Sequence, residues 1–289
     1  MLLEDAVAAP SRALVCGTAK TVHRYRTAVE RLCPSVEARA LEVLCFQPDP
    51  AALRRAALRV LESQGQKEAR PLHVIVTSAA AVRMMQEAID EIRGNRHECA
   101  EPSCCAGPLV LTVRGCGTEA ACRSSSSFAS VLYCGDRLCD IYRFLSERPP
   151  TPTLLLGVRS GGDRSYQADP ALRASIEFIG VYDTRESPGA ATAVQDALRW
   201  AGARCHVVVT SSKSAELVAQ VVQSNRGAAR RELTFVAQGK STAAALHAAL
   251  PEEPFGGERY RVLVALAPTA EAVAAVLQHH PTARCTQTG

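Results

Sequence analysis

Short apolar runs of this chain end repeatedly in small hydroxyl residues. Side-chain hydroxyls at such places cap the helix that follows, and the amides of a helix's first turn attract anions. The pattern therefore predicts binding sites for the carboxylates or phosphates of a small ligand. The residues concerned are Thr77, Ser78, Thr118, Thr210, Ser211, Ser212 and Thr242.

Cationic side chains and one phenol accompany these hydroxyls. Arg159 and Arg164 flank a glycine pair after an apolar run, and Lys240 lies beside Thr242. Arginine binds a carboxylate through two parallel hydrogen bonds, so these three residues are candidate charge partners of a ligand. Tyr182 ends the run 176–181. A phenol keeps its proton at neutral pH and can donate a hydrogen bond to a departing hydroxyl.

Each of these assignments has a structural alternative. A hydroxyl that follows an apolar run can do no more than cap its helix. Arg159 and Arg164 can be solvated loop charges, and Tyr182 can simply pack where two domains meet. Several equivalent positions at strand ends favour a ligand site over isolated caps.

The hydroxyl residues lie in a repeated pattern of elements. The segments 71–91 (PLHVIVTSAAAVRMMQEAIDE) and 205–222 (CHVVVTSSKSAELVAQVV) each read as strand, hydroxyl pair and helix. The segments 109–121 and 233–246 each read as strand, glycine turn, threonine and alanine-rich helix. β-Branched runs too short for a helix predict buried strands, and apolar residues at helical spacing predict the helices.

The rest of the chain continues the alternation of strands and helices. Asp49, ahead of Pro50, is a candidate helix cap with proline in the first turn. The alternation predicts α/β architecture, namely two similar domains with parallel sheets covered by helices on both faces. Ligands bind such sheets at the carboxyl ends of the strands. Further strands are expected at 13–17, 42–46, 131–133, 154–158, 176–182 and 260–266, and further helices at 22–32, 51–61, 136–145, 189–202 and 269–277.

Composition narrows the class of protein. A chain of 289 residues with 47% hydrophobic and 21% charged residues is long enough for two domains. No apolar run approaches the roughly 20 residues of a membrane span. The first residues carry Glu4 and Asp5 and resemble no secretory signal, so we expect a cytoplasmic protein without a membrane partner. The net charge is +4, and the basic residues are scattered along the sequence. The scatter disfavours a nucleic-acid partner, and the positive net charge suits a polyanionic small substrate.

The 12 cysteines do not indicate a metal site. No two of them have the C-x2-C spacing of zinc sites, even in the densest stretch, from His97 to Cys122. We expect free thiols and no metal.

A competing interpretation of the protein's function comes from Gly115 to Ala120. This stretch fits the G-x-G-x-x-A pattern of dinucleotide-binding proteins, with Asp136 downstream. The serine run 124–127 fits that interpretation poorly.

The order of the motifs resembles the uroporphyrinogen-III synthase family. VTSAAAV, GCGT, VYDT, VVTSSKSA, QGKSTAAAL and APTAEAVAAVL follow one another between residues 13 and 277. The chain departs from the family at Ala79, where proline is common, and at 239–242. The resemblance implies two α/β domains joined by two antiparallel strands, with the substrate in the cleft between them. It places the strands at 43–46 and 181–184, one domain at 1–42 and 185–289, and the other at 43–184.

The resemblance also implies a reaction. The family cyclises hydroxymethylbilane, a linear polycarboxylate tetrapyrrole, and inverts its last ring through a spiro intermediate to give uroporphyrinogen III. It implies a monomer, no metal and no cofactor. The protein must hold a flexible polyanion in one shape and help a hydroxyl leave as water. By this resemblance Tyr182 is the candidate proton donor. The alternative is a two-domain protein that binds a small molecule without catalysis.

Overall fold

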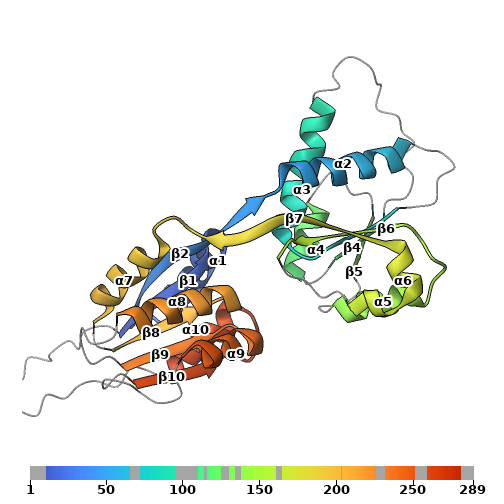
Figure 1. Cartoon of the computed structure of the whole chain (residues 1–289). Helices are drawn as coiled ribbons and strands as arrows, with labels where there is room; N and C mark the ends of the chain where they lie inside the picture. The colour runs from blue at the N-terminus through green and yellow to red at the C-terminus, as the bar shows by residue number, and fades with distance from the viewer. Residues whose placement is uncertain are drawn as a thin grey trace, which may run out of the picture. The chain divides into compact units, whose positions relative to one another are not determined.

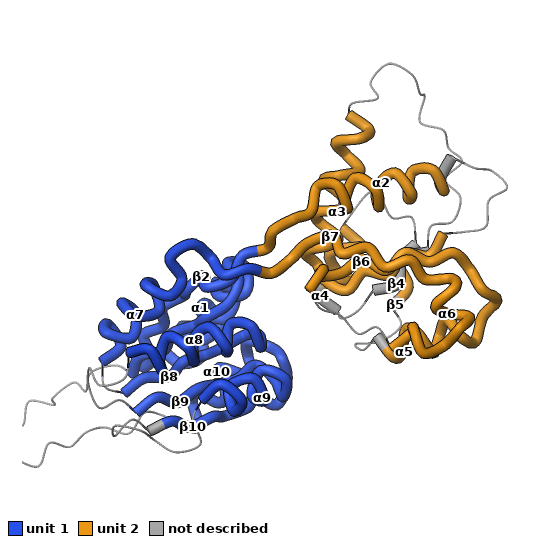
Figure 2. Tube along the Cα trace, in the orientation of Figure 1, with its two compact units in different colours: residues 1–45, 185–289 blue, residues 46–184 orange. Residues whose placement is uncertain are grey.

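The computed structural model describes the chain in two units. The described residues are 11–65, 72–94, 110–113, 116–124, 130–133, 138–160, 165–202, 204–225, 232–250 and 259–280. Unit 1 comprises residues 1–45 and 185–289, and unit 2 comprises residues 46–184 (Figure 2). None of the helices found in these ranges is long and apolar enough to span a membrane.

Unit 1 is a parallel sheet with helices on both faces (Figure 1). Its strands lie in the order β10-β9-β8-β1-β2. Helices α7, α8 and α9 bury their apolar sides against one face, and α1 and α10 bury theirs against the other. The elements are β1 (Ser11–Thr18), α1 (Ala19–Leu32), β2 (Val36–Pro48), α7 (Ala190–Ala201), β8 (Arg204–Val209), α8 (Ser212–Ser224), β9 (Glu232–Ala237), α9 (Lys240–Ala249), β10 (Arg259–Val264) and α10 (Ala270–His279).

Unit 2 repeats this architecture with the order β7-β6-β3-β4-β5, again with parallel neighbours. Helices α2 and α3 pack on one face of the sheet, and α5 and α6 pack on the other (Figure 1). The elements are α2 (Pro50–Gly65), β3 (His73–Val76), α3 (Ala79–Gly94), β4 (Val110–Val113), α4 (Cys116–Arg123), β5 (Ser130–Tyr133), α5 (Leu138–Ser146), β6 (Thr153–Val158), the 3-10 turn η1 (Ser165–Ala168), α6 (Pro170–Ser175) and β7 (Ile176–Glu186).

The half-repeats expected from the sequence occupy equivalent places in the two units. The series β3-α3-β4-α4-β5-α5 of unit 2 corresponds to β8-α8-β9-α9-β10-α10 of unit 1. β6 and β1 then lie beside β3 and β8, respectively. The predicted fold class, two similar α/β units with parallel sheets, is confirmed.

Two strands carry the chain between the units. β2 contains the boundary between Cys45 and Phe46, and β7 contains the boundary between Thr184 and Arg185. Ser187 N–H donates to Val43 O at 3.0 Å, and Asp49 N–H donates to Val181 O at 2.9 Å. These pairings show that the two strands run in opposite directions. The cleft expected between the units remains a prediction.

Two of the differences from the expected strand boundaries have a clear physical reason. β2 begins at Val36 rather than 42, because Glu37 and Arg39 alternate outward while Val36 and Ala38 are buried. The last strand was expected to reach Leu266 but ends at Val264. Val264 pairs with Ala237, the final residue of β9, so the ladder has no partner strand beyond it.

The two central strands carry equivalent buried histidines. His73 of β3 and His206 of β8 each lie four residues before the strand-end threonine and are almost fully buried. Neither Nδ1 atom has a hydrogen-bond partner among the described residues. Burial lowers the pKa of both rings. At His73 the positive charge of Arg148 lowers the pKa further. At His206 the hydrogen bond between Nε2 and His280 O raises the pKa and so partly offsets the effect of burial. Both rings are therefore held neutral.

We expect the free energy of unfolding to fall as the pH drops below about 6.5, the usual pKa of an exposed histidine. The unfolded chain then binds protons that the folded chain refuses, so acid favours unfolding. Urea midpoints between pH 7.5 and pH 5 would measure the slope. His206→Gln should flatten it, whereas the exposed His247→Gln should not. A slope that His206→Gln leaves unchanged would contradict this account.

Unit 2 is continuous in sequence and has its own core. A fragment of residues 46–184 should therefore unfold cooperatively, as domains with their own core do. A fragment of residues 1–150 should not, because it contains β1 and β2 without β8 and lacks β6 and β7 from the sheet of unit 2. Thermal melts of both fragments followed by circular dichroism test this. Equally sharp transitions in the two fragments would be inconsistent with the division into units.

Candidate active site

The predicted hydroxyl residues lie at the carboxyl ends of the strands in both units, but their hydrogen bonds and their burial differ. Thr77 and Ser78 follow β3, and Thr210 and Ser211 follow β8. The structure divides the hydroxyls into those that hold the sheet, those that are buried, those that bond within the first turns of α8 and α9, and Ser78, which remains able to donate.

The strand-end threonines tie neighbouring strands together. Thr77 donates both its N–H and its hydroxyl to Leu156 O of β6, at 3.3 and 3.2 Å. Thr210 donates both groups to Cys16 O of β1, at 3.2 and 3.0 Å. Each hydroxyl has thereby used its only proton, and the lone pairs that remain repel a carboxylate. These two hydroxyls hold the strand ends, and the carboxylate-binding role predicted for them gains no support.

A glycine makes room for each of these threonines. A Cβ at Gly17 would lie 2.1 Å from Thr210 Oγ1, and a Cβ at Gly157 would lie 3.2 Å from Thr77 Oγ1. The contact is closer in unit 1. A glycine is therefore needed at the end of β1 so that the Thr210 hydroxyl can approach the backbone.

Thr118 and Thr242 are buried. Each is the third residue of its helix, α4 or α9, and their exposed fractions are 6% and 4%. Both threonines therefore lie in the interior of the helix-sheet layer. The substrate-binding role predicted for them remains a prediction.

Ser78 differs from the other hydroxyls because it receives two hydrogen bonds. Ala81 N–H donates to Ser78 Oγ at 3.1 Å, which caps α3, and the Tyr182 hydroxyl donates to the same oxygen at 3.0 Å. No described residue accepts the proton of Ser78. Two bonds donated to one hydroxyl polarise it and make it a better donor. Ser78 is therefore a hydroxyl positioned to donate to a ligand.

Tyr182 is held rigidly behind Ser78. Its ring is 6% exposed and meets Phe46 edge-to-face, with ring centroids 5.2 Å apart. Burial raises the pKa of Tyr182 above its usual value, and the bond to Ser78 partly opposes this. The phenol thus stays protonated at neutral pH. Tyr182 was predicted to contact a leaving hydroxyl itself, but in the structure its proton is directed to Ser78.

In unit 1 the first turns of α8 and α9 lie side by side. The Ser212 hydroxyl donates to Ser241 O at 3.2 Å. Ser211 and Ser214 form a capping box, in which each hydroxyl oxygen accepts from the other residue's backbone N–H. Their hydroxyl protons are also used, because Ser211 donates to Ser214 Oγ and Ser214 donates to Ser211 O. Gly239, by contrast, gives α9 no side-chain cap, and Lys240 beside it is exposed. Uncapped first-turn amides next to a lysine can bind a carboxylate.

Arg159 has a protein partner. Its guanidinium pairs with the carboxylate of Asp49. The same carboxylate accepts a hydrogen bond from Ala52 N–H and caps α2, as expected.

The backbone of Arg159 also approaches β7 closely, and its N–H donates to Tyr182 O at 2.7 Å. A Cβ at Gly180 would lie 2.8 Å from Arg159 Cα, so this close approach requires glycine. More than half of the Arg159 side chain is exposed, which leaves it accessible to a ligand; Arg164 lies outside the described residues.

The same loop contains contacts that the sequence did not predict. The Ser160 hydroxyl donates to the Asp183 carboxylate. The contacts that Asp49, Phe46 and Asp183 make with the site residues were found only from the structure, because each joins residues distant in sequence. The single available signal was the sequence VYDT, which places Tyr182 and Asp183 at one strand end.

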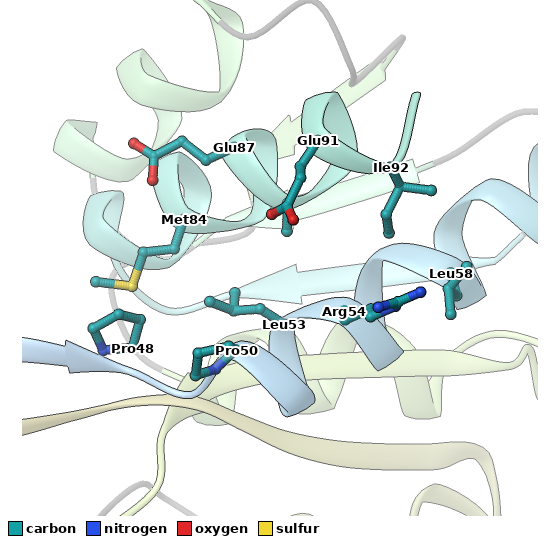
Figure 3. A pocket seen from close by; sticks show the side chains of 10 residues that line it. Pro48, Pro50, Leu53, Arg54, Leu58, Met84, Glu87, Glu91 and Ile92 are labelled. Carbon is teal, nitrogen blue, oxygen red and sulfur yellow. The ribbon is translucent and has the colours of Figure 1, made fainter. Parts of the chain in front are cut away.

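A cavity of about 530 Å³ lies between α2 and α3 (Figure 3). None of the predicted site residues that the structure describes lines it. Its floor is apolar, with Glu87 and Glu91 of α3 opposite Arg54 of α2. The lining residues are Pro48, Pro50, Leu53, Arg54, Leu58, Met84, Glu87, Ala88, Glu91 and Ile92.

The described residues contain no group of three or more His, Cys, Asp or Glu side chains able to hold a metal ion. The cysteine-rich stretch 95–109 lies outside them, as do Gly115 and Asp136 of the dinucleotide-like motif. In unit 2 the described strand ends offer one free hydroxyl donor, Ser78, and the exposed Arg159. In unit 1 they offer Lys240 and the uncapped first-turn amides of α9. Cations and helix-terminal amides can each bind a carboxylate, and a free hydroxyl can donate to a leaving oxygen.

Comparison with known proteins supports the same architecture. No family model matches the sequence. No curated protein matches it either. Among solved structures, the chain is similar to uroporphyrinogen-III synthetase from Helicobacter pylori, at 15% identity and a TM-score of 0.51, with 93% of this chain and 99% of that one covered. It is also similar to a mutant uroporphyrinogen III synthase from Thermus thermophilus, at 13% identity and a TM-score of 0.50, with 93% and 98% covered. The chain thus has the fold of the uroporphyrinogen III synthases, and the resemblance drawn from its motifs is confirmed at the level of the fold.

Proposed function

We propose that this protein is a uroporphyrinogen-III synthase, a cofactor-independent lyase that cyclises hydroxymethylbilane with inversion of its last ring. The observation that carries the proposal is the Tyr182–Ser78 pair at the carboxyl end of the unit 2 sheet. It supplies a neutral proton donor where ligands bind sheets of this kind. The similarity of fold to two synthases adds support.

In the proposed mechanism Ser78 donates to the hydroxyl that leaves the substrate. The carbon–oxygen bond breaks with its electron pair on oxygen, and the hydroxyl departs as water with a proton supplied through Ser78 from Tyr182. The delocalised cation that remains closes the ring by way of the spiro intermediate and then loses a proton, which restores the donor. Both donors are neutral before the reaction, so no charge has to be buried in the resting protein.

Substrate carboxylates are proposed to bind at the exposed cations and the uncapped helix end. Lys240 and the first-turn amides of α9 form one such place in unit 1, and Arg159 forms another in unit 2. Contacts of this kind contribute little alone, but each restricts the conformations of a flexible polyanion.

The proposal is tested by the isomer of the product. Purified protein is coupled to hydroxymethylbilane synthase, and the oxidised porphyrins are separated into isomers I and III. We expect isomer III, whereas heat-inactivated protein should give isomer I, the product of spontaneous closure. A protein that only binds small molecules would leave the isomer ratio equal to that of the control.

A further inference from the structure

An exposed leucine stands at the carboxyl edge of the unit 1 sheet. Only two large apolar side chains of the described residues are exposed, Val264 at 41% and Leu266 at 102%. Leu266 lies two residues after the end of β10 and precedes α10. It makes no contribution to the core of the unit, so its position needs another explanation.

The loop that carries Leu266 is fixed on both sides. On one side Ala265 is buried and donates its N–H to Ala237 O at 3.0 Å. On the other, Thr269 caps α10 through Ala272 N–H, and Thr269 N–H is bonded to Ala267 O at 2.8 Å. The exposure of Leu266 is therefore built into the fold and does not come from a frayed end.

Bonds to Pro268 O place this loop beside the candidate site. Tyr25 Oη donates to Pro268 O at 3.1 Å, and Gln238 Nε2 donates to the same oxygen at 3.2 Å. Gln238 N–H is in turn bonded to Val209 O at 3.0 Å, at the end of β8. Gln238 also precedes Gly239 and the uncapped start of α9. Leu266 thus lies at the same edge of the unit 1 sheet as Lys240 and the first-turn amides of α9, which are the groups proposed to bind carboxylates.

We propose that Leu266 is a substrate-contact residue, which packs against the face of a pyrrole ring while the amides and Lys240 at the same edge hold carboxylate arms. This inference rests on the proposed function and names a residue of the same site. Linear tetrapyrroles alternate apolar ring faces with charged arms, and a site of hydroxyls, amides and cations alone would leave the rings without an apolar contact. A single leucine among small neighbours suits a small ligand, because a stable protein partner needs about 800 Å² on each side.

The test compares steady-state kinetics of Leu266→Ser, Leu266→Met and Val264→Ser with the unchanged protein in the coupled isomer assay. Burial of one leucine side chain corresponds to about a tenfold to hundredfold change in binding, so Leu266→Ser should raise KM by about tenfold or more. We expect kcat to stay within about twofold, because the contact forms in the substrate complex as well as in the transition state. Leu266→Met should restore most of the binding.

Val264→Ser is the matched control, because it removes the other exposed large apolar side chain, at the end of β10, and should leave KM unchanged. A KM for Leu266→Ser equal to that of the unchanged protein would overturn the inference and leave the proposed function intact. So would an equal rise in KM for Val264→Ser, or a large fall in the melting temperature of Leu266→Ser. If the unchanged protein itself yields no isomer III, the proposed function fails, and this inference fails with it.

Discussion

Replacing Ser78 by alanine should lower kcat by about a hundredfold to ten-thousandfold, the range for loss of a general acid. The substitution removes the hydroxyl that accepts bonds from Tyr182 and Ala81 and that is free to donate to the substrate. Tyr182→Phe should cost less, about tenfold, because Ser78 keeps its own proton and its cap bond and loses only the phenol that polarises it and replaces that proton. Coupled-assay kinetics on both variants measure the two effects.

Two controls separate catalysis from capping. Ser78→Ala also loses a helix cap, which costs about 1 kcal/mol of stability. Asp169→Ala loses the cap of α6, where Asp169 accepts bonds from Ala171 and Leu172, and it should melt early while keeping its kcat. Ser78→Thr keeps a hydroxyl and should recover most of the rate. If Ser78→Ala turned over like Asp169→Ala, Ser78 would be only a cap and the proton would come from elsewhere.

Gly17→Ala should destabilise the protein by about 1–3 kcal/mol, the usual cost of overpacking. The new Cβ would lie 2.1 Å from Thr210 Oγ1, so the threonine would have to rotate and give up its bond to Cys16 O. Gly157→Ala, at the equivalent place in unit 2, should cost less than about 1 kcal/mol, because its contact of 3.2 Å is relieved by a small shift. Urea unfolding of the two variants gives the comparison.

The double variant Gly17→Ala/Thr210→Ala shows whether the clash is the cause. Thr210→Ala alone loses a hydrogen bond, at a cost of about 1 kcal/mol. Since the clash disappears with the hydroxyl, the double variant should be more stable than the sum of the single effects predicts. Strictly additive effects would show that Gly17 is required for some other reason.

Much of the fold followed from local patterns. The strand expected ahead of the hydroxyl pair in the segment 71–91 is β3, His73–Val76, and the helix expected at 189–202 is α7, Ala190–Ala201. The apolar positions 215, 217, 218, 221 and 222 are all buried in α8. These segments have strong periodicity and clear ends. The length of β2 was underestimated because its half-buried stretch around Glu37 and Arg39 lacks a continuous apolar run.

The sequence predicted where the candidate site residues lie, but not which of them bond to one another. Sequence placed Ser78 and Tyr182 at strand ends, but the hydrogen bond between them joins residues that only the sheet order brings together. Likewise, nothing in a sequence shows that the Thr210 hydroxyl is used by Cys16 O, or that Asp49 pairs with Arg159. Leu266 was expected at the end of a strand, and its exposure depends on β9 ending at Ala237.

The measurement that tests the proposed activity most directly is the fraction of isomer III as protein is added to a constant supply of hydroxymethylbilane. If the chain is a synthase, this fraction rises with protein concentration until isomer III dominates, and Ser78→Ala shifts the rise to much higher concentration. A fraction that stays at the protein-free value at every concentration would show that the chain does not catalyse the closure.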